Sequence, residues 1–175
     1  MRMPLYRCNY AVVFGLMLLQ CGCTSSRPMA ANRFEIAGDV QQPKRWSAAE
    51  FRAAFESDLQ EATATSKGRE IHFRGVPLLK VIERAEPKAN LDRKNAALAL
   101  AVVVEARDRY AAAFSLCELR DEYGHAPAFV AVEIDRRPLE ADRGPVELIV
   151  PNDRKSSRWV HSVARIHVVD LTREN

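Results

Sequence analysis

Cysteine is scarce in this sequence, and its placement excludes a fold held together by disulfides. Three of the four cysteines, Cys8, Cys21 and Cys23, lie near the start of the 175-residue chain. Only Cys117 lies beyond them, so no internal disulfide is available to the rest of the chain. Internal repeats and low-complexity tracts are also absent, and the 47% apolar content is ordinary for a globular protein. We therefore expect one domain with a single substantial core.

Long apolar runs are missing too. The run Tyr10 to Leu19, YAVVFGLMLL, is too short to cross about 30 Å of hydrocarbon as a helix. A basic start, this short apolar middle and the small residues that follow predict a secretory signal peptide over residues 1–31, which leaves 32–175 as the domain. Gly22-Cys23 also resembles a bacterial lipoprotein box, so lipidation of Cys23 competes with cleavage near Ala30 or Ala31.

The charge of the chain gives no signature of a nucleic-acid or membrane-surface protein. Arg2, Arg7 and Arg27 are the only charges of the predicted leader, so its loss leaves 23 cations against 23 acids. A neutral domain with mixed charges predicts no binding to nucleic acid, and membrane contact only through the leader or a lipid on Cys23. We expect an exported, periplasmic protein, either released or anchored by lipid.

The apolar pattern predicts an α+β fold with a mixed or antiparallel sheet. Ser47 and Glu50 have the spacing of a capping box and predict a helix start, and Pro77 suits the first turn of a second helix. We expect a short third helix near residues 118–123. Strands are expected over residues 34–40, 59–66, 70–73, 97–106, 111–116, 128–135, 146–150 and 163–171. The segment QQPKRW before Ser47 is expected to be a break, and Lys67-Gly68 the turn of a hairpin between the second and third strands.

The order of five short motifs resembles a known family. They are IAGDVQQPKRWSAAEF, FRGVPLLKVIERA, ARDRYAAAFSLCEL, VAVEIDRRPL and GPVELIVPNDRKSSRWVHSVARIHV. In this order they are similar to the oxidoreductase molybdopterin-binding domain, the catalytic fold of the sulfite oxidases, in its small stand-alone exported form. The resemblance covers about residues 34–170. It implies a mixed β-sheet domain with a few short helices and a site for molybdopterin.

The candidate cofactor-binding residues lie in the last motif. Arg154, Lys155, Ser157 and Arg158 offer cations, hydroxyls and backbone donors close together, which is the mixture that a phosphate needs. The resemblance implies that this loop, just before Trp159, helps to hold the pterin and its phosphate. The alternative is that the loop is a solvated tip, and that Trp159 and Val160 after it simply fill the core.

Other motifs depart from the family pattern. Arg109 and Arg136 stand where the family usually has Gly, and we expect their two loops to differ slightly from the family's. Glu147 stands where the family commonly has Arg, which weakens an anion-binding role for its strand. The GVPL turn at Gly75 offers a helix N-terminus to an anion, although a plain strand-to-helix turn is the simpler interpretation.

The resemblance also implies a cysteine that this chain lacks. In the family, a thiolate on the segment before the GVPL helix binds molybdenum, and here that segment, EATATSKGREIHF, has no Cys. Cys117 lies far downstream and is expected to fill space in the core. Tyr110, where sulfite oxidases have a tyrosine near the metal, is expected in the core with a hydroxyl partner.

The leader gives a second argument. Family members take up their cofactor before folded export by the twin-arginine route, and no twin-arginine motif precedes the apolar run. We predict no catalytic residue and no metal ligand.

Three functions stay open. The first is a non-catalytic relative that binds a pterin or another small anionic ligand. The second is a molybdopterin-dependent oxidoreductase subunit. The third is a cofactor-free module that binds an envelope protein partner.

Overall fold

The structure, a computed structural model, describes residues 32–89, 94–123, 126–139 and 143–172. The predicted leader and its cleavage and lipidation sites lie outside these ranges. Within them, no helix combines the length and the apolar character needed to cross a bilayer.

Two five-stranded sheets form the framework. The first has the strand order β2-β1-β10-β5-β6, and β1 (Arg33–Gly38) runs parallel to β10 (Val163–Asp170). The other pairings in this sheet are antiparallel, so it is a mixed sheet, as predicted. Its remaining strands are β2 (Lys44–Ser47), β5 (Leu100–Ala106) and β6 (Ala111–Ser115).

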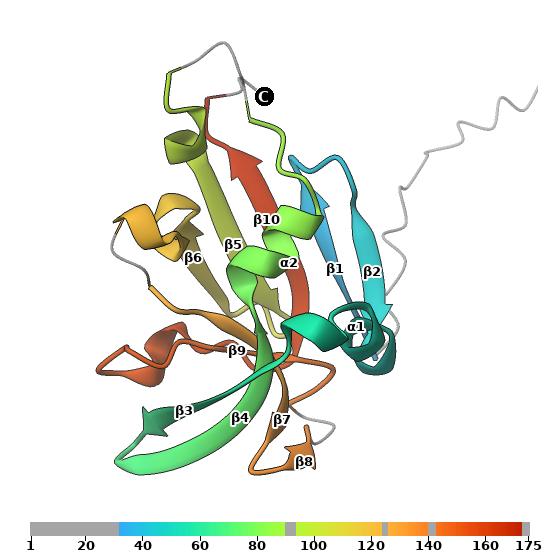
Figure 1. The fold of residues 1–175 in the computed structure, drawn as a ribbon, viewed down its shortest axis with the longest axis vertical. Coiled ribbons are helices and arrows are strands. Elements are labelled where there is room, and N and C mark those ends of the chain that lie inside the picture. Colours follow the sequence, from blue (N-terminus) through green and yellow to red (C-terminus); the bar gives the residue numbers. More distant parts are fainter. Residues whose placement is uncertain (1–31, 90–93, 124–125, 140–142, 173–175) are drawn as a thin grey trace, which may run out of the picture.

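The second sheet is built on a long curved hairpin that extends below the first sheet (Figure 1). Its order is β3-β4-β7-β8, with β9 paired to β7. The strands are β3 (Gln60–Ser66), β4 (Arg69–Pro77), β7 (Phe129–Ile134), β8 (Arg137–Pro138) and β9 (Glu147–Ile149). The hairpin prediction is confirmed, because Ser66 pairs with Arg69 across the Lys67-Gly68 turn.

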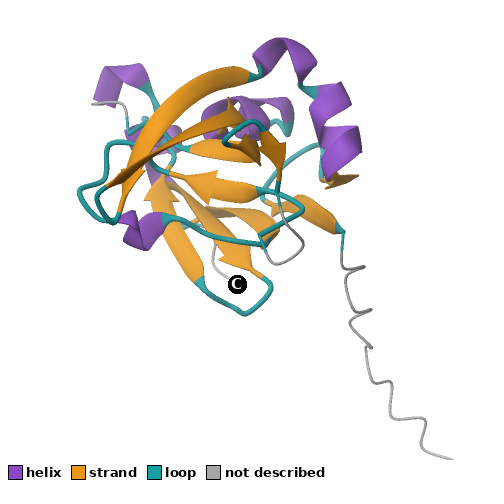
Figure 2. Ribbon diagram, turned by 90° about the horizontal axis from the view of Figure 1, so that it is seen from below, coloured by secondary structure: helices purple, strands orange, loops and turns teal. Residues whose placement is uncertain are grey.

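Two short α-helices lie against the sheets. The helix α1 (Ala48–Ala54) begins at the predicted capping box, in which Ser47 and Glu50 hydrogen-bond to each other's backbone N–H groups. The helix α2 (Leu78–Arg84) follows β4 and buries Leu78, Val81 and Ile82. Figure 2 shows the strands at the centre of the molecule and the helices at its periphery.

One core cluster joins both sheets and both helices. Phe34 and Ile166 come from the first sheet, Phe73 and Val130 from the second, and Phe51 from α1. Burial of these large apolar side chains is the main favourable contribution to folding, at about 1.5–3 kcal/mol for each.

Several predicted elements were wrong in detail. The segment expected as one helix forms two 3-10 turns, η3 (Cys117–Leu119) and η4 (Asp121–Tyr123). The predicted strand at 97–106 begins only at Leu100, because the alanine-rich start forms a 3-10 helix, η2 (Ala96–Ala99). The segment before Ser47, expected to be a break, forms the edge strand β2.

The two loops expected to differ from the family's have positive backbone angles. Arg109 has a φ of 74°, and Asp135 and Arg136 have φ values of 49° and 61°. Left-handed backbone favours glycine, and other residues adopt it at a cost of about 1–2 kcal/mol. Both loops therefore adopt, without glycine, the backbone conformation that glycine favours.

Candidate functional site

The tip of the β3–β4 hairpin meets the loop predicted to bind an anion. The hydroxyl of Ser66 donates a hydrogen bond of 3.2 Å to the hydroxyl of Ser156, which is 90 positions away in the sequence. Ser156 opens a short 3-10 helix, η5 (Ser156–Arg158). The segment without the family's cysteine and the predicted phosphate loop therefore lie side by side in the fold.

Arg158 is held by two carboxylates. Its guanidinium makes a bidentate contact with Asp153, at 2.6 and 2.8 Å, and reaches Glu118 at 3.2 Å. It also lies over the ring of Phe114, 5.0 Å from the ring centroid. Hydrogen bonds to Asp153 outweigh burial and hold the pKa of Arg158 above its usual range, with the Asp153 and Glu118 charges adding to the effect. The guanidinium of Arg158, the strongest of the predicted anion-binding groups, is therefore already paired with two carboxylates.

The other predicted ligands are exposed. Arg154, Lys155 and Ser157 all lie at the surface, before or within η5. Among the described residues, the side chains of Arg154 and Lys155 have no ion pair. Of the four candidates, they are the cations free to meet a ligand.

Tyr110 belongs to this site rather than to the core. The residue is 47% exposed, so the prediction of a core residue was wrong. Its hydroxyl does have a partner, as expected, because it donates a hydrogen bond to the backbone carbonyl of Ser157. The turn before β6 is thereby tied to η5.

The chain after η5 anchors the loop in the core, as the alternative interpretation predicted. Trp159 is 6% exposed, and its indole N–H donates a 3.1 Å hydrogen bond to the carbonyl of Val150. Val160 is fully buried and pairs with Leu148. The loop is therefore a polar tip on a buried support.

A buried carboxylate that the sequence did not place lies on β9. Glu147 is fully buried, and both of its oxygens accept hydrogen bonds from Arg143, at 2.8 Å each. The Nδ1 atom of His161 lies 2.8 Å from the same carboxylate. The only sequence signal for this arrangement was an acid inside the apolar run VELIV. A charge buried in such a run needs partners.

In the GVPL segment, β4 ends at Pro77 and α2 begins at Leu78. Pro77 has no N–H, and the N–H of Leu78 donates to the carbonyl of Ala128, so neither of these two residues has a backbone donor free for an anion.

Cys117 and the described histidines do not assemble a metal site. Cys117 is buried, as expected of a residue that fills space in the core. His72, His161 and His167 lie at the surface, while His125 falls outside the described residues. The described part of the chain holds no group of three or more His, Cys, Asp or Glu side chains placed to bind a metal ion.

The model of one protein family matches residues 24–175, described as the oxidoreductase molybdopterin binding domain. The chain belongs to this family. Its fold is also similar to the crystal structure of the sulfane dehydrogenase SoxCD from Paracoccus pantotrophus, with a TM-score of 0.60 and 17% sequence identity. The match covers 82% of this chain but only 40% of that chain. No curated protein matches the sequence.

The comparisons agree with the fold class predicted from the sequence. The chain is a molybdopterin-binding, oxidoreductase-like domain with the α+β fold of the sulfite oxidases. At 17% identity the structural likeness concerns the fold alone, and the family match makes molybdopterin the natural cofactor to consider.

Proposed function

We propose that this domain is a non-catalytic member of its family, without a molybdenum centre, that binds a small anionic ligand of the pterin phosphate class at Arg154 and Lys155. The observation that carries the proposal is the contact between Ser66 and Ser156. The hairpin segment in which the family carries its metal-binding cysteine here presents a hydroxyl to the loop. A neutral hydroxyl is a poor ligand for a metal that selects soft thiolate.

The charges around the site also fit a cofactor with molybdenum and phosphate poorly. Glu147, where the family commonly has Arg, puts a buried carboxylate on the strand that leads to the loop. Arg158 is already shared between Asp153 and Glu118. An incoming phosphate would have to displace these carboxylates, so its attraction has to come from the exposed cations. We derive no catalytic step through the cofactor.

Export and a periplasmic location belong to the same proposal and rest on the leader. Its short apolar run after a basic start supports export by the ordinary secretory route, which threads an unfolded chain. A cofactor inserted before export would be lost on that route. An envelope protein partner without any small ligand is the competing function, and it is an outcome of the test below.

The test uses pyrophosphate as the probe of anion binding. We expect the full chain to bind pyrophosphate weakly, with an affinity that falls as salt is raised, because both cations are exposed. The double variant Arg154→Gln/Lys155→Gln is expected to weaken this binding about tenfold, or about 1.4 kcal/mol. Calorimetric or NMR titration measures the change.

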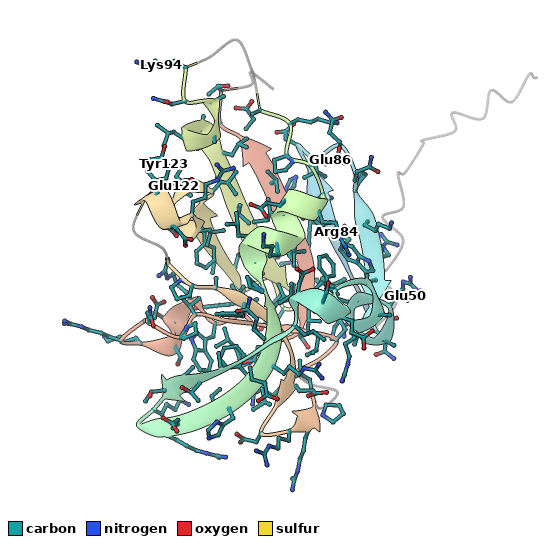
Figure 3. All side chains as sticks on the ribbon, viewed as in Figure 1. Glu50, Arg84, Glu86, Lys94, Glu122 and Tyr123 are labelled. Carbon is teal, nitrogen blue, oxygen red and sulfur yellow. The ribbon has the colours of Figure 1, made fainter. Side chains whose placement is uncertain are left out.

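The matched control is Lys44→Gln/Lys94→Gln, which removes the same charge elsewhere. Figure 3 shows Lys94 at the opposite end of the molecule from the hairpin. Equal loss of affinity in both double variants would mean that net charge, and not a site, attracts the anion. No saturable binding by the parent chain would favour the protein-partner function.

A further inference from the structure

A cavity lies away from the site described above. It has a volume of about 460 Å³, which is within the range of small-molecule pockets. It lies between α2, the η3–η4 segment and the start of β7. Gln60 lines it at one end of β3, whereas Ser66 reaches the candidate site at the other end. At about 3.3 Å per residue, the two places are roughly 20 Å apart.

The wall of this cavity contains a buried donor without an acceptor. The Nε atom of Arg120 is buried and has no hydrogen-bond partner. Among the described residues, no hydrogen bond or ion pair involves any other atom of its guanidinium. An unsatisfied buried donor is unfavourable, and more so when the group is charged. The Nε atom itself has almost no accessible surface, so an acceptor from outside the chain has to bind the terminal nitrogens of Arg120, which lines the cavity.

The other residues that line the cavity limit which ligands can carry this acceptor. The apolar part of the wall comes from Leu79, Leu119 and Phe129. Lys80 does not compete for an anion, because its ammonium lies 3.2 Å from the carboxylate of Glu83.

The mouth of the cavity carries acids. Asp121 and Glu122 line the cavity and are exposed, and Figure 3 shows Glu122 at the outer edge of the molecule. A ligand with one carboxylate can place it on Arg120 and its apolar part on Phe129. A second carboxylate would face the acids at the mouth, where like charges repel.

We propose that this cavity binds a small monocarboxylate with an apolar body, whose carboxylate accepts hydrogen bonds from Arg120. Guanidinium and carboxylate pair with matching geometry, and such charge-assisted hydrogen bonds are roughly twice as strong as neutral ones. The site uses none of the residues of the proposed anion loop, so its test succeeds or fails independently of that function.

The test is an NMR titration of the full chain with 3-phenylpropionate as the probe. We expect saturable shifts of backbone amides around Leu119 and Phe129. The dianion phenylsuccinate and the cation 2-phenylethylamine are expected to bind at least about tenfold more weakly. Equal binding of all three compounds would overturn the proposal, as would no saturation by 3-phenylpropionate up to about 10 mM.

Variants at Arg120 test the donor itself. Arg120→Met and Arg120→Gln are both expected to weaken 3-phenylpropionate binding at least tenfold, without lowering the unfolding temperature, because the arginine has no partner to lose. Arg107→Gln, which removes an exposed arginine elsewhere, is the control and is expected to bind as the parent does. Unchanged binding by a folded Arg120 variant would contradict the assignment.

Discussion

At the scale of single residues, the role of a cation depends on which carboxylates the fold brings to it. Arg158 was predicted to bind an anion because it stands among hydroxyls and other cations. The structure gives it Asp153, which is five positions away, and Glu118, which is 40 positions away. The nearer acid was visible in the sequence, but the distant one was not, because its approach depends on how β6 and η3 pack against η5.

Asp153→Asn is predicted to strengthen pyrophosphate binding severalfold. Loss of the carboxylate removes both hydrogen bonds that hold Arg158 and leaves only Glu118 to compete for the guanidinium. The released cation then adds to Arg154 and Lys155. The titration used for the parent chain measures the gain.

Asp58→Asn is the matched control, because it removes one acid at a distance from the loop. If both variants bind alike, general electrostatics accounts for the gain. Weaker binding by Asp153→Asn would show that the ion pair positions the loop instead of competing with the ligand.

At the scale of elements, the exposed face of the first sheet carries a row of alternating charges. Glu35 on β1 is paired with Arg45 on β2, at 2.6 Å, and with Arg165 on β10, at 2.8 Å. Arg165 also approaches Glu105 on β5 at 3.9 Å. The strand register places these side chains in one line. Opposite charges directly across from each other stabilise a sheet.

Glu35→Gln is predicted to lower the free energy of unfolding by about 1 kcal/mol at neutral pH. Burial raises the pKa of Glu35, but hydrogen bonds from Arg45 and Arg165 lower it by more, so its pKa lies below the usual 4.5. A lowered folded-state pKa contributes stability above pH 4.5 and loses it as the pH falls through the folded value. The difference between parent and variant should therefore shrink below pH 4.5.

Urea unfolding at pH 7 and at a series of acidic values measures this difference. Glu56→Gln, at an exposed carboxylate on the 3-10 helix η1 (Glu56–Asp58), is the control for loss of one charge. A parent–variant difference that stays constant to about pH 2 would contradict the account of the Glu35 pKa.

Elements with strong local signals could be predicted from the sequence, and those set by tertiary contacts could not. The capping box at Ser47 and the Lys67-Gly68 hairpin use only neighbouring residues, and both were predicted correctly. The edge strand β2 exists because β1 pairs with it, and no apolar alternation marks it. Tyr110 was placed in the core with a partner for its hydroxyl, but it is exposed, and its partner is the carbonyl of Ser157, 47 positions away.

At the scale of the whole molecule, the fold brings together three segments that are far apart in the sequence. Ser66, Tyr110 and Glu118 each make a hydrogen bond to the loop at residues 153–158, the proposed anion site. The order of the motifs predicted the fold and the position of this loop. It did not predict that the carboxylates of Asp153 and Glu118 pair with Arg158. The central claim is that this assembly keeps the family fold without a molybdenum centre.

Metal and pterin analysis of the full-length precursor tests that claim most directly. The protein is expressed in a host that makes molybdopterin and recovered from the envelope fraction. Metal mass spectrometry and fluorescence of the oxidised pterin are then measured after denaturation. We predict a molar ratio of molybdenum to chain far below one, whether or not pterin is released. One molybdenum per chain would contradict the account.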